Sequence, residues 1–366
     1  DGTVKNYEPA EVLSVEISRS KGALKQGLDE IMDPDLAEAL AAEGDEKAYP
    51  GALKVVLLDK HHYKLRDDGK YAWTSRTIAR VLKEKGKAAG FDNWNIDPEK
   101  EEFEIDHART INGDQVTNLS SRTVKTAVVH SSMPEYRRQK NTKFALPEIK
   151  VGSVIDYQVT RLVEADPFHH PFSLALERNS AGDSHSLDAG NNESWNPAPC
   201  SFYARTPLVK KEVVFDLPED FKYRAMVLND EDSIIDKDVK LVDGRRIVSY
   251  RSKRAQAAEP KEYAQPAMAE YQPLVLFGEK TSWKALHRAV RDYFVPSKAD
   301  MKAAKARLSA MKEARDEKGR LQPGDIYRYC ALELSHPSIG LRDYSPKPRP
   351  VAEILESNRA SRLDSA

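Results

Sequence analysis

Residues 53–81 read LKVVLLDKHHYKLRDDGKYAWTSRTIARV, and this stretch decides how the chain is expected to fold. The apolar run at its start is followed by a turn signal at Asp67-Asp68-Gly69. After the turn, every second position carries an aromatic, small or β-branched residue: Tyr71, Trp73, Ser75, Thr77, Ala79 and Val81. A period of two is the pattern of a strand with two different faces. The stretch therefore predicts a long β-hairpin.

The same strand pattern continues to about Ser252. VGSVIDYQVTRLV (Val151–Val163) places Val151, Ile155, Tyr157 and Val159 on one predicted face. Val242-Asp243-Gly244-Arg245 is typical of a tight hairpin turn. Residues 179–199 are rich in Ser, Asn, Asp and Gly, which favours a long loop. Short strands separated by turn residues predict an antiparallel β-sandwich over residues 53–254.

Helical patterns flank this strand-rich region. Residues 1–52 form a predicted α-helical segment in which Asp33 caps a helix beginning at Pro34. Residues 255–281 are punctuated by prolines and predict a linker. In residues 282–366, Ser282 and Ser297 are expected to cap two helices. The expected fold is mainly β, with a helical preface and the helical start of a second domain.

Composition narrows the range of functions. The 366 residues include 57 Lys and Arg against 58 Asp and Glu, a net charge of −1, so no global field favours nucleic acid. The longest apolar runs are too short to cross a bilayer as a helix, and we expect no transmembrane segment. Cys200 and Cys330 fall in different predicted domains and are expected to be unpaired.

The sequence predicts neither a cofactor site nor a metal site. It has no glycine-rich phosphate loop. His61-His62 and His169-His170 are adjacent pairs, and neighbouring residues of a strand point to opposite faces, so they cannot readily share one ion. Three tryptophans in the strand-rich region could stack on sugars, although burial in the core is the commoner role: Trp73, Trp94 and Trp195.

Several stretches of the sequence resemble one bacterial family. They are VVLLD (55–59), HARTINGDQV (107–116), ALPEIKVGSVIDY (145–157), SFYARTPLVKKEVVFDLP (201–218) and QPAMAEYQPLVLFGEKTSW (265–283). The family is the group of export-associated bacterial proteins that join a β-sandwich domain of unknown function to a transglutaminase-like domain. IYRYCALELS (326–335) and YSPKPRPVAEIL (344–355) resemble the approach to the active site of that second domain.

The resemblance places arginine at the position of the nucleophile. Family members continue with Asn-Arg-Tyr-Gly-Asp-Cys-Lys-Asp-Lys-Ala, and an alignment without gaps puts Arg362 opposite the cysteine. A nucleophilic cysteine works as a thiolate at a helix N-terminus, whereas a guanidinium stays protonated and has no lone pair for attack. The resemblance therefore implies a degenerate site with no catalytic residue. Cys330, in an apolar run, is expected to be a core thiol.

A small basic cluster near this position is the candidate binding site for a partner. Its members are Lys347, Arg349 and Arg362. The alternative is that Pro348 and Pro350 hold this part as an extended, solvated segment. His336, which precedes Pro337, is more typical of an exposed or capping residue than of a catalytic base.

The resemblance implies a periplasmic, secreted or cell-surface location. We expect a non-catalytic binding or scaffolding protein whose partner is a protein, a peptide or a peptidoglycan-like ligand. Two alternatives stay open. One is a cysteine-type transglutaminase or peptidase whose catalytic groups lie outside residues 1–366. The other is a carbohydrate-binding β-sandwich, which requires exposed aromatic rings on one sheet face.

Overall fold

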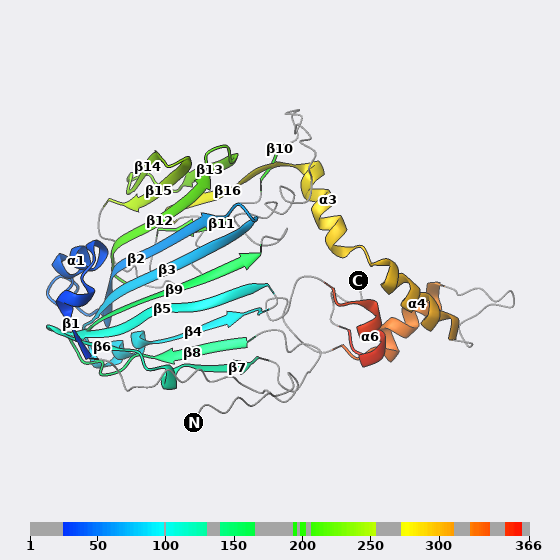
Figure 1. Cartoon of the computed structure of the whole chain (residues 1–366), viewed down its shortest axis with the longest axis horizontal. Coiled ribbons are helices and arrows are strands. Elements are labelled where there is room, and N and C mark those ends of the chain that lie inside the picture. Colours follow the sequence, from blue (N-terminus) through cyan, green and yellow to red (C-terminus); the bar gives the residue numbers. More distant parts are fainter. Residues whose placement is uncertain are drawn as a thin grey trace, which may run out of the picture.

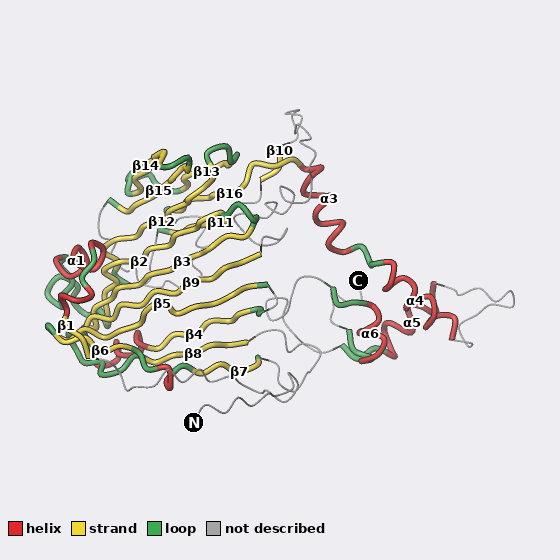
Figure 2. The backbone as a smooth tube through the Cα atoms, viewed as in Figure 1, coloured by secondary structure: helices red, strands yellow, loops and turns green. Residues whose placement is uncertain are grey.

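The computed structural model describes residues 25–98, 100–129, 140–164, 193–195, 198–202, 206–253, 272–310, 323–336 and 348–360. Strands dominate this part of the chain, as Figure 2 shows, and the mainly β fold predicted from sequence is confirmed. Three sheets account for the strands, with nine, four and three members.

The nine-stranded sheet is the centre of the fold (Figure 1). In spatial order its strands are β1 (Lys25–Gly27), β6 (Gln115–Asn118), β5 (Glu101–Asn112), β9 (Val154–Glu164), β3 (Lys70–Val81), β2 (Lys54–Leu65), β12 (Leu208–Pro218), β15 (Arg245–Ser252) and β14 (Ile235–Val242). All neighbours pair antiparallel except β2 and β12, which run parallel. The predicted hairpin is confirmed, because Leu65 pairs with Tyr71 across the turn between β2 and β3.

Two smaller sheets pack against one face of the large sheet, which we call the inner face. The first contains β4 (Phe91–Ile96), β8 (Lys140–Ala145) and β7 (Lys125–Val128). The second contains β10 (Glu193–Trp195), β11 (Ala198–Ser201), β13 (Tyr223–Leu228) and β16 (Leu274–Ser282). Phe144 of β8 packs with Ala79, and Phe277 of β16 packs with Phe215, so each small sheet shares a core with the large one. This is a sandwich.

The outer face of the large sheet is partly covered by helix α1 (Pro34–Ala41). Asp33 caps this helix as predicted, since its Oδ1 accepts a hydrogen bond from the Leu36 backbone N–H at 2.9 Å. Leu36 is fully buried against Leu58 and Ile78. Short 3₁₀ turns lie at Leu28–Ile31, Glu84–Gly90 and Ser121–Thr123. The predicted helical pattern before residue 25 lies outside the described residues.

Helices follow the sandwich at the C-terminal side (Figure 1). They are α3 (Trp283–Phe294), α4 (Lys298–Ala310), α5 (Pro323–Arg328), which continues as a π-helical turn (Tyr329–Glu333), and α6 (Val351–Ser357). The two predicted caps are confirmed: Ser282 Oγ accepts from the Ala285 N–H and Ser297 Oγ accepts from the Asp300 N–H, each at 3.1 Å.

Three segments differ from their sequence-based expectation. Leu274–Ser282 falls largely within the expected linker, but it is strand β16 because its apolar residues pair with β13 and fill the core. Val151 is 49% exposed because it stands in the turn before β9, where Gly152 adopts a φ of +89°. Within the expected loop, residues 193–195 and 198–199 belong to strands, and residues 179–192 lie outside the described residues.

Candidate functional site

A row of rings crosses the inner face in the middle of the sandwich. We call His61, Tyr63, Trp73, Trp94 and Phe103 the aromatic cluster. His61 and Tyr63 of β2 stack on Trp73 of β3 with centroid distances of 5.8 and 6.2 Å. Trp94 of β4 meets Trp73 edge-on at 5.7 Å and contacts Phe103 of β5 at 5.8 Å. Strand alternation places the β2, β3 and β5 members on one face, and all five side chains are half-buried.

Three nitrogen atoms of this cluster are buried without a hydrogen-bond partner. They are His61 Nδ1, Trp73 Nε1 and Trp94 Nε1. Buried polar groups in proteins almost always have a partner, and an unsatisfied one costs about 1–3 kcal/mol. Three such atoms within one aromatic cluster therefore mark a place where an ordered water would be stabilising, or a ligand group that displaced the side chains now enclosing them.

The charge of the neighbouring groups fixes what these nitrogens can do. Asp59 Oδ1 lies 3.1 Å from His61 Nε2, and its Oδ2 accepts from Lys211 Nζ at 2.5 Å. Burial would raise the pKa of Asp59, but the His61 hydrogen bond and the Lys211 charge outweigh it and hold that pKa well below its usual range. A carboxylate only accepts, so His61 Nε2 carries a hydrogen, and in the neutral imidazole Nδ1 then offers a lone pair. The indole nitrogens are donors.

An arginine covers one side of the aromatic cluster. The Arg161 guanidinium of β9 lies 5.6 Å from the centroid of Trp73, within the range of a cation–π contact. Its Nε also donates to Glu101 Oε2 at 2.7 Å. The cluster thus combines rings, two indole N–H groups and one imidazole nitrogen without partners, and one paired cation.

A second group of polar side chains lies on the outer face and is structural. Asp156 of β9 is fully buried, and it accepts hydrogen bonds from Arg76 Nε at 3.0 Å and Arg109 Nε at 2.9 Å. Arg76 also reaches Asp33, the cap of α1, with its Nη2 at 2.8 Å. Burial would raise the pKa of Asp156, but hydrogen bonds from His107 and Arg76 hold it well below its usual range. This ion network joins α1 to the sheet.

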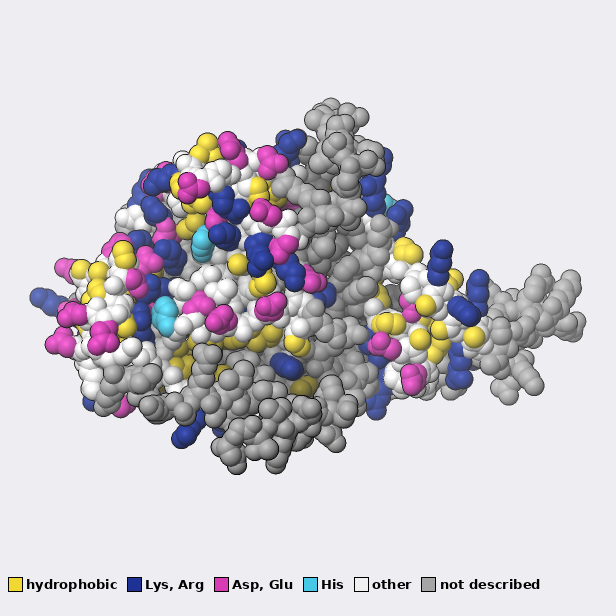
Figure 3. Space-filling view, viewed as in Figure 1, with side chains coloured by type: hydrophobic (Ala, Val, Ile, Leu, Met, Phe, Trp, Pro, Cys, Tyr) yellow, Lys and Arg dark blue, Asp and Glu magenta, His cyan; other side chains and the backbone are white. Residues whose placement is uncertain are grey.

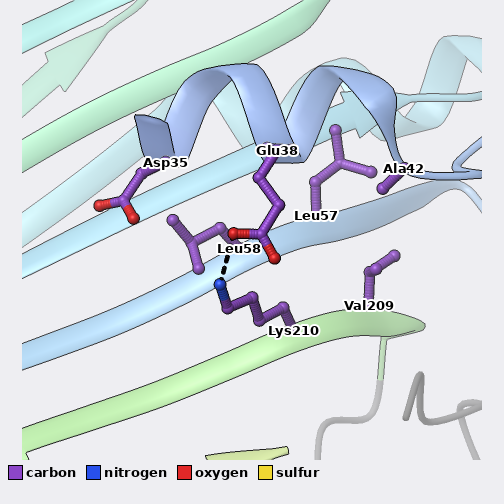
Figure 4. Close-up of a pocket in the computed structure, with 8 residues that line it drawn as sticks. Asp35, Glu38, Ala42, Leu57, Leu58, Val209 and Lys210 are labelled. Carbon is purple, nitrogen blue, oxygen red and sulfur yellow. Dashed lines mark hydrogen bonds and ion pairs between the residues drawn. The ribbon is translucent and has the colours of Figure 1, made fainter. Parts of the chain in front are cut away.

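The cavity beneath α1 is too small to be a ligand site. It holds about 30 Å³, room for one or two water molecules, between α1, β2 and β12 (Figure 4). Lys210 crosses its mouth to Glu38, with Nζ and Oε2 2.6 Å apart. On the face of the molecule seen in Figure 3, basic and acidic side chains of the described residues are interspersed, as on an ordinary solvated surface.

The motifs of the ion network lead to the family. His107 and Arg109 come from HARTINGDQV and Asp156 from ALPEIKVGSVIDY, two of the stretches that carry the sequence resemblance. A family described as a domain of unknown function with solved structure, DUF3857, matches residues 67–259, just over half of the chain. The chain belongs to the DUF3857 family. No curated protein matches the chain.

A solved structure shares the fold of this DUF3857 chain. A protein from Parabacteroides distasonis ATCC 8503, described as a "putative protease", superposes with a TM-score of 0.61 at 13% identity over 86% of this chain. The chain spans 57% of the length of that structure. An M1 zinc metallopeptidase from Deinococcus radiodurans gives a TM-score of 0.29 at 11% identity, over 63% of this chain and 44% of its own, which does not indicate a shared fold.

The basic cluster expected from sequence is placed only in part. Lys347 and Arg362 lie outside the described residues. Arg349 differs from the expectation of a partner-binding side chain, because it is only 6% exposed. Its Nη2 donates to the Arg359 carbonyl oxygen, so the guanidinium holds the segment after α6. The proline-flanked position that suggested a solvated side chain is packed against the end of α6 instead.

The two cysteines and His336 have structural roles among the described residues. Cys330 and Cys200 are free cysteines, as predicted, and burial raises the pKa of Cys200 to about 11, which keeps it unreactive. The His336 ring lies between two carbonyl oxygens, 2.7 Å from that of Cys330 and 3.1 Å from that of Ala360. His336 therefore joins the π-helical turn (Tyr329–Glu333) to the residues after α6.

Sequence reasoning identified two of the five members of the aromatic cluster as candidate stacking rings. It named Trp73 and Trp94 but gave no reason to add His61, which joins them because β2 and β3 pair in a particular register. His61 and His62 do point to opposite faces, His61 towards Asp59 and His62 towards Asp216. The described residues contain no group of acidic, His and Cys side chains that could hold a metal. His169 and His170 lie outside those residues. No helix among them is long and apolar enough to cross a membrane.

Proposed function

We propose that this chain is a non-catalytic binding or scaffolding protein of the bacterial envelope or cell surface, periplasmic or secreted. The proposal includes a degenerate transglutaminase-like domain that follows the sandwich, with Arg362 in place of a nucleophile. Support for this second domain comes from the stretches at 326–335 and 344–355. Support for export comes from the family resemblance alone.

One observation carries the binding role. The aromatic cluster holds two indole donors, Trp73 Nε1 and Trp94 Nε1, and one acceptor, His61 Nδ1, none with a partner. A peptide group offers one acceptor and one donor, so an extended peptide could satisfy an indole and the imidazole together while its side chains pack on the rings. The ligand we favour is therefore a protein segment, a peptide or the peptide part of a peptidoglycan-like molecule.

Proton NMR of the indole N–H groups tests this role in the full chain. The protein has four tryptophans, and Trp73→Phe and Trp94→Phe assign their signals. Addition of a peptidoglycan-derived peptide or an unstructured peptide should move the Trp73 and Trp94 signals downfield, because their N–H groups gain acceptors. The other two signals serve as the reference. Trp94→Phe should weaken binding by up to about tenfold, the loss of one neutral hydrogen bond.

The opposite results are equally definite. If no ligand of the panel shifts either indole signal of the folded protein, the aromatic cluster is not a binding site. Shifts produced by oligosaccharides and not by peptides would favour the carbohydrate-binding alternative, for which the ring-lined inner face is the supporting observation.

A second candidate is a cysteine-type protease or transglutaminase. The fold shared with a protein described as a protease favours it. A thiol-directed activity probe, applied to the full-length protein, discriminates the two functions. We expect labelling no faster than that of the denatured protein, because the Cys200 thiol is buried and the partly buried Cys330 does not occupy the nucleophile position in the proposed domain. Labelling abolished by a single cysteine substitution would establish the enzyme instead.

A further inference from the structure

Among the strands that the structure describes, none pairs with the free side of the last strand of the nine-stranded sheet. β14 is its last strand and pairs only with β15 among the described strands. It is eight residues long, and all eight residues pair with β15, so the backbone is regular up to the edge. An edge strand presents a row of unpaired N–H and C=O groups on its free side, and these groups can pair with another strand.

The side chains of this edge are unusually apolar for an exposed strand. Val239, Leu241 and Val242 are 46%, 61% and 50% exposed. The other members of IDKDVKLV include two aspartates and two lysines, at 236, 238, 237 and 240, so the strand carries no net charge. Asp238 and Lys240 already form an ion pair at 2.9 Å along the outer face. The edge strand therefore combines three exposed apolar side chains with two acidic and two basic ones, and its net charge is zero.

We propose that β14 is a self-association surface, on which a second copy of the chain pairs its own β14 in antiparallel orientation. Such a pair is symmetric about a two-fold axis. The numbers of any two facing residues therefore add up to the same value along the whole pair. Opposite residues of a sheet point to the same side, which requires partners that are both even or both odd. The two-fold axis must then lie between the two strands, at the level of one residue of β14 that faces its own copy.

Charge selects one position of that axis. Axes at Asp236, Lys237, Asp238 or Lys240 would set a like charge directly opposite itself, which is destabilising. An axis at Leu241 pairs only the last few residues, and an axis at Ile235 only the first few. An axis at Val239 brings Val239 against its copy and places Asp238 opposite Lys240 on both sides. This register pairs residues 236–242, seven of the eight residues of β14, and contains no like-charged pair.

The lysines fit this arrangement as well as a protective role. Lysine on an edge strand usually discourages pairing with other chains. Here acidic and basic residues alternate in the order Asp236, Lys237, Asp238, Lys240. Repulsion between like charges therefore disfavours the other registers, whereas the Val239 register contains no such repulsion. Lys237 does not obstruct it, because its Nζ lies over the ring of Tyr250, 5.9 Å from the centroid. One strand pair buries less than the roughly 1,000 Å² of a stable interface, so the dimer is weak.

Disulfide trapping tests the register directly. In the proposed pair the two Val239 Cα atoms are about 4.5–5.5 Å apart, within the range that a disulfide spans. Val239→Cys should therefore form a covalent dimer under mild oxidation. In Leu241→Cys the two copies are separated by four residues, about 13 Å, and should not cross-link. The unsubstituted protein, with Cys200 and Cys330, is the background. Equal cross-linking of the two variants, or none in folded Val239→Cys, overturns the proposal.

A charge exchange tests the same register without a covalent bond. Lys240→Asp places Asp opposite Asp238 twice and should weaken self-association by at least about tenfold in sedimentation experiments. The double variant Asp238→Lys with Lys240→Asp restores both opposite pairs and should return the dissociation constant to near that of the unsubstituted protein. Circular dichroism checks that each variant is folded. A double variant no better than Lys240→Asp, or a protein that stays monomeric at millimolar concentration, contradicts the proposal.

Discussion

Asp156 is the residue on which the outer-face ion network depends. It balances the guanidinium groups of Arg76 and Arg109 while it is fully buried. Asp156→Asn keeps the shape but leaves two buried cations short of an anion, so we expect a loss of about 3–5 kcal/mol in unfolding free energy. Urea denaturation measures it. Glu104→Gln, on an exposed position of β5, is the control and should stay within about 0.5 kcal/mol.

The same carboxylates predict how stability changes with pH. The pKa values of Asp156 and Asp59 are depressed in the folded protein. A depressed folded pKa stabilises the protein fully above the unfolded value, near 3.9, and this contribution is lost as pH falls towards the folded value. The unfolding free energy should therefore drop steeply below about pH 4. Asp156→Asn should show a shallower drop. A parent protein equally stable at pH 3 and pH 7 would contradict this.

At the scale of an element, the 3₁₀ turn at Glu84–Gly90 depends on a glycine. A Cβ on Gly86 would lie 2.0 Å from the carbonyl oxygen of Leu53. That oxygen cannot move away easily, since it accepts from the N–H groups of Leu82 and Lys83 at 2.9 and 3.1 Å. We expect Gly86→Ala to lower the melting temperature, at a cost of about 1–3 kcal/mol.

A matched glycine shows whether the cost comes from the contact. Gly27 has a φ of −73°, and the nearest atom to an added Cβ, Glu30 Oε1, is 3.6 Å away. Gly27→Ala should therefore be neutral or stabilising by up to about 1 kcal/mol. A Gly86 variant as stable as the Gly27 variant would mean that the turn can relax around the new methyl group.

At the scale of the whole molecule, the family match does not mark a folding unit. Residues 67–259 omit β2, which lies between β3 and β12 in the middle of the sheet, and they omit β16. A fragment of these residues would expose Ile78, which packs against β2, and Phe215, which stacks on Phe277 of β16. We expect it to lack a cooperative thermal transition, whereas residues 25–294 should show one. Calorimetry of the two fragments, with the full chain as reference, decides it.

The sequence predicts the local features of this fold well and the long-range ones poorly. The 53–81 hairpin, the Asp33 cap and the Ser282 cap depend on neighbouring residues, and all three are confirmed. Strand β16 was missed because its apolar run adjoins prolines and gains its partners only from distant strands. Only two of the five members of the aromatic cluster were identified, for the same reason. Alternation shows which residues of a strand share a face, but not which strand lies beside that strand. The burial of Arg349 depends on its packing against the end of α6, and no local sequence pattern predicts that contact.

The parallel pairing of β2 with β12 also has a consequence in time. Asp59 and Lys211, which join these strands, are 152 residues apart in the chain. At a synthesis rate of 5–20 residues per second, β12 leaves the ribosome on the order of ten seconds after β2. Throughout that interval β2 has an unpaired edge, to which a strand of another chain can bind in a crowded cell. The protein's yield should therefore respond to translation speed and to chaperones that shield nascent strands.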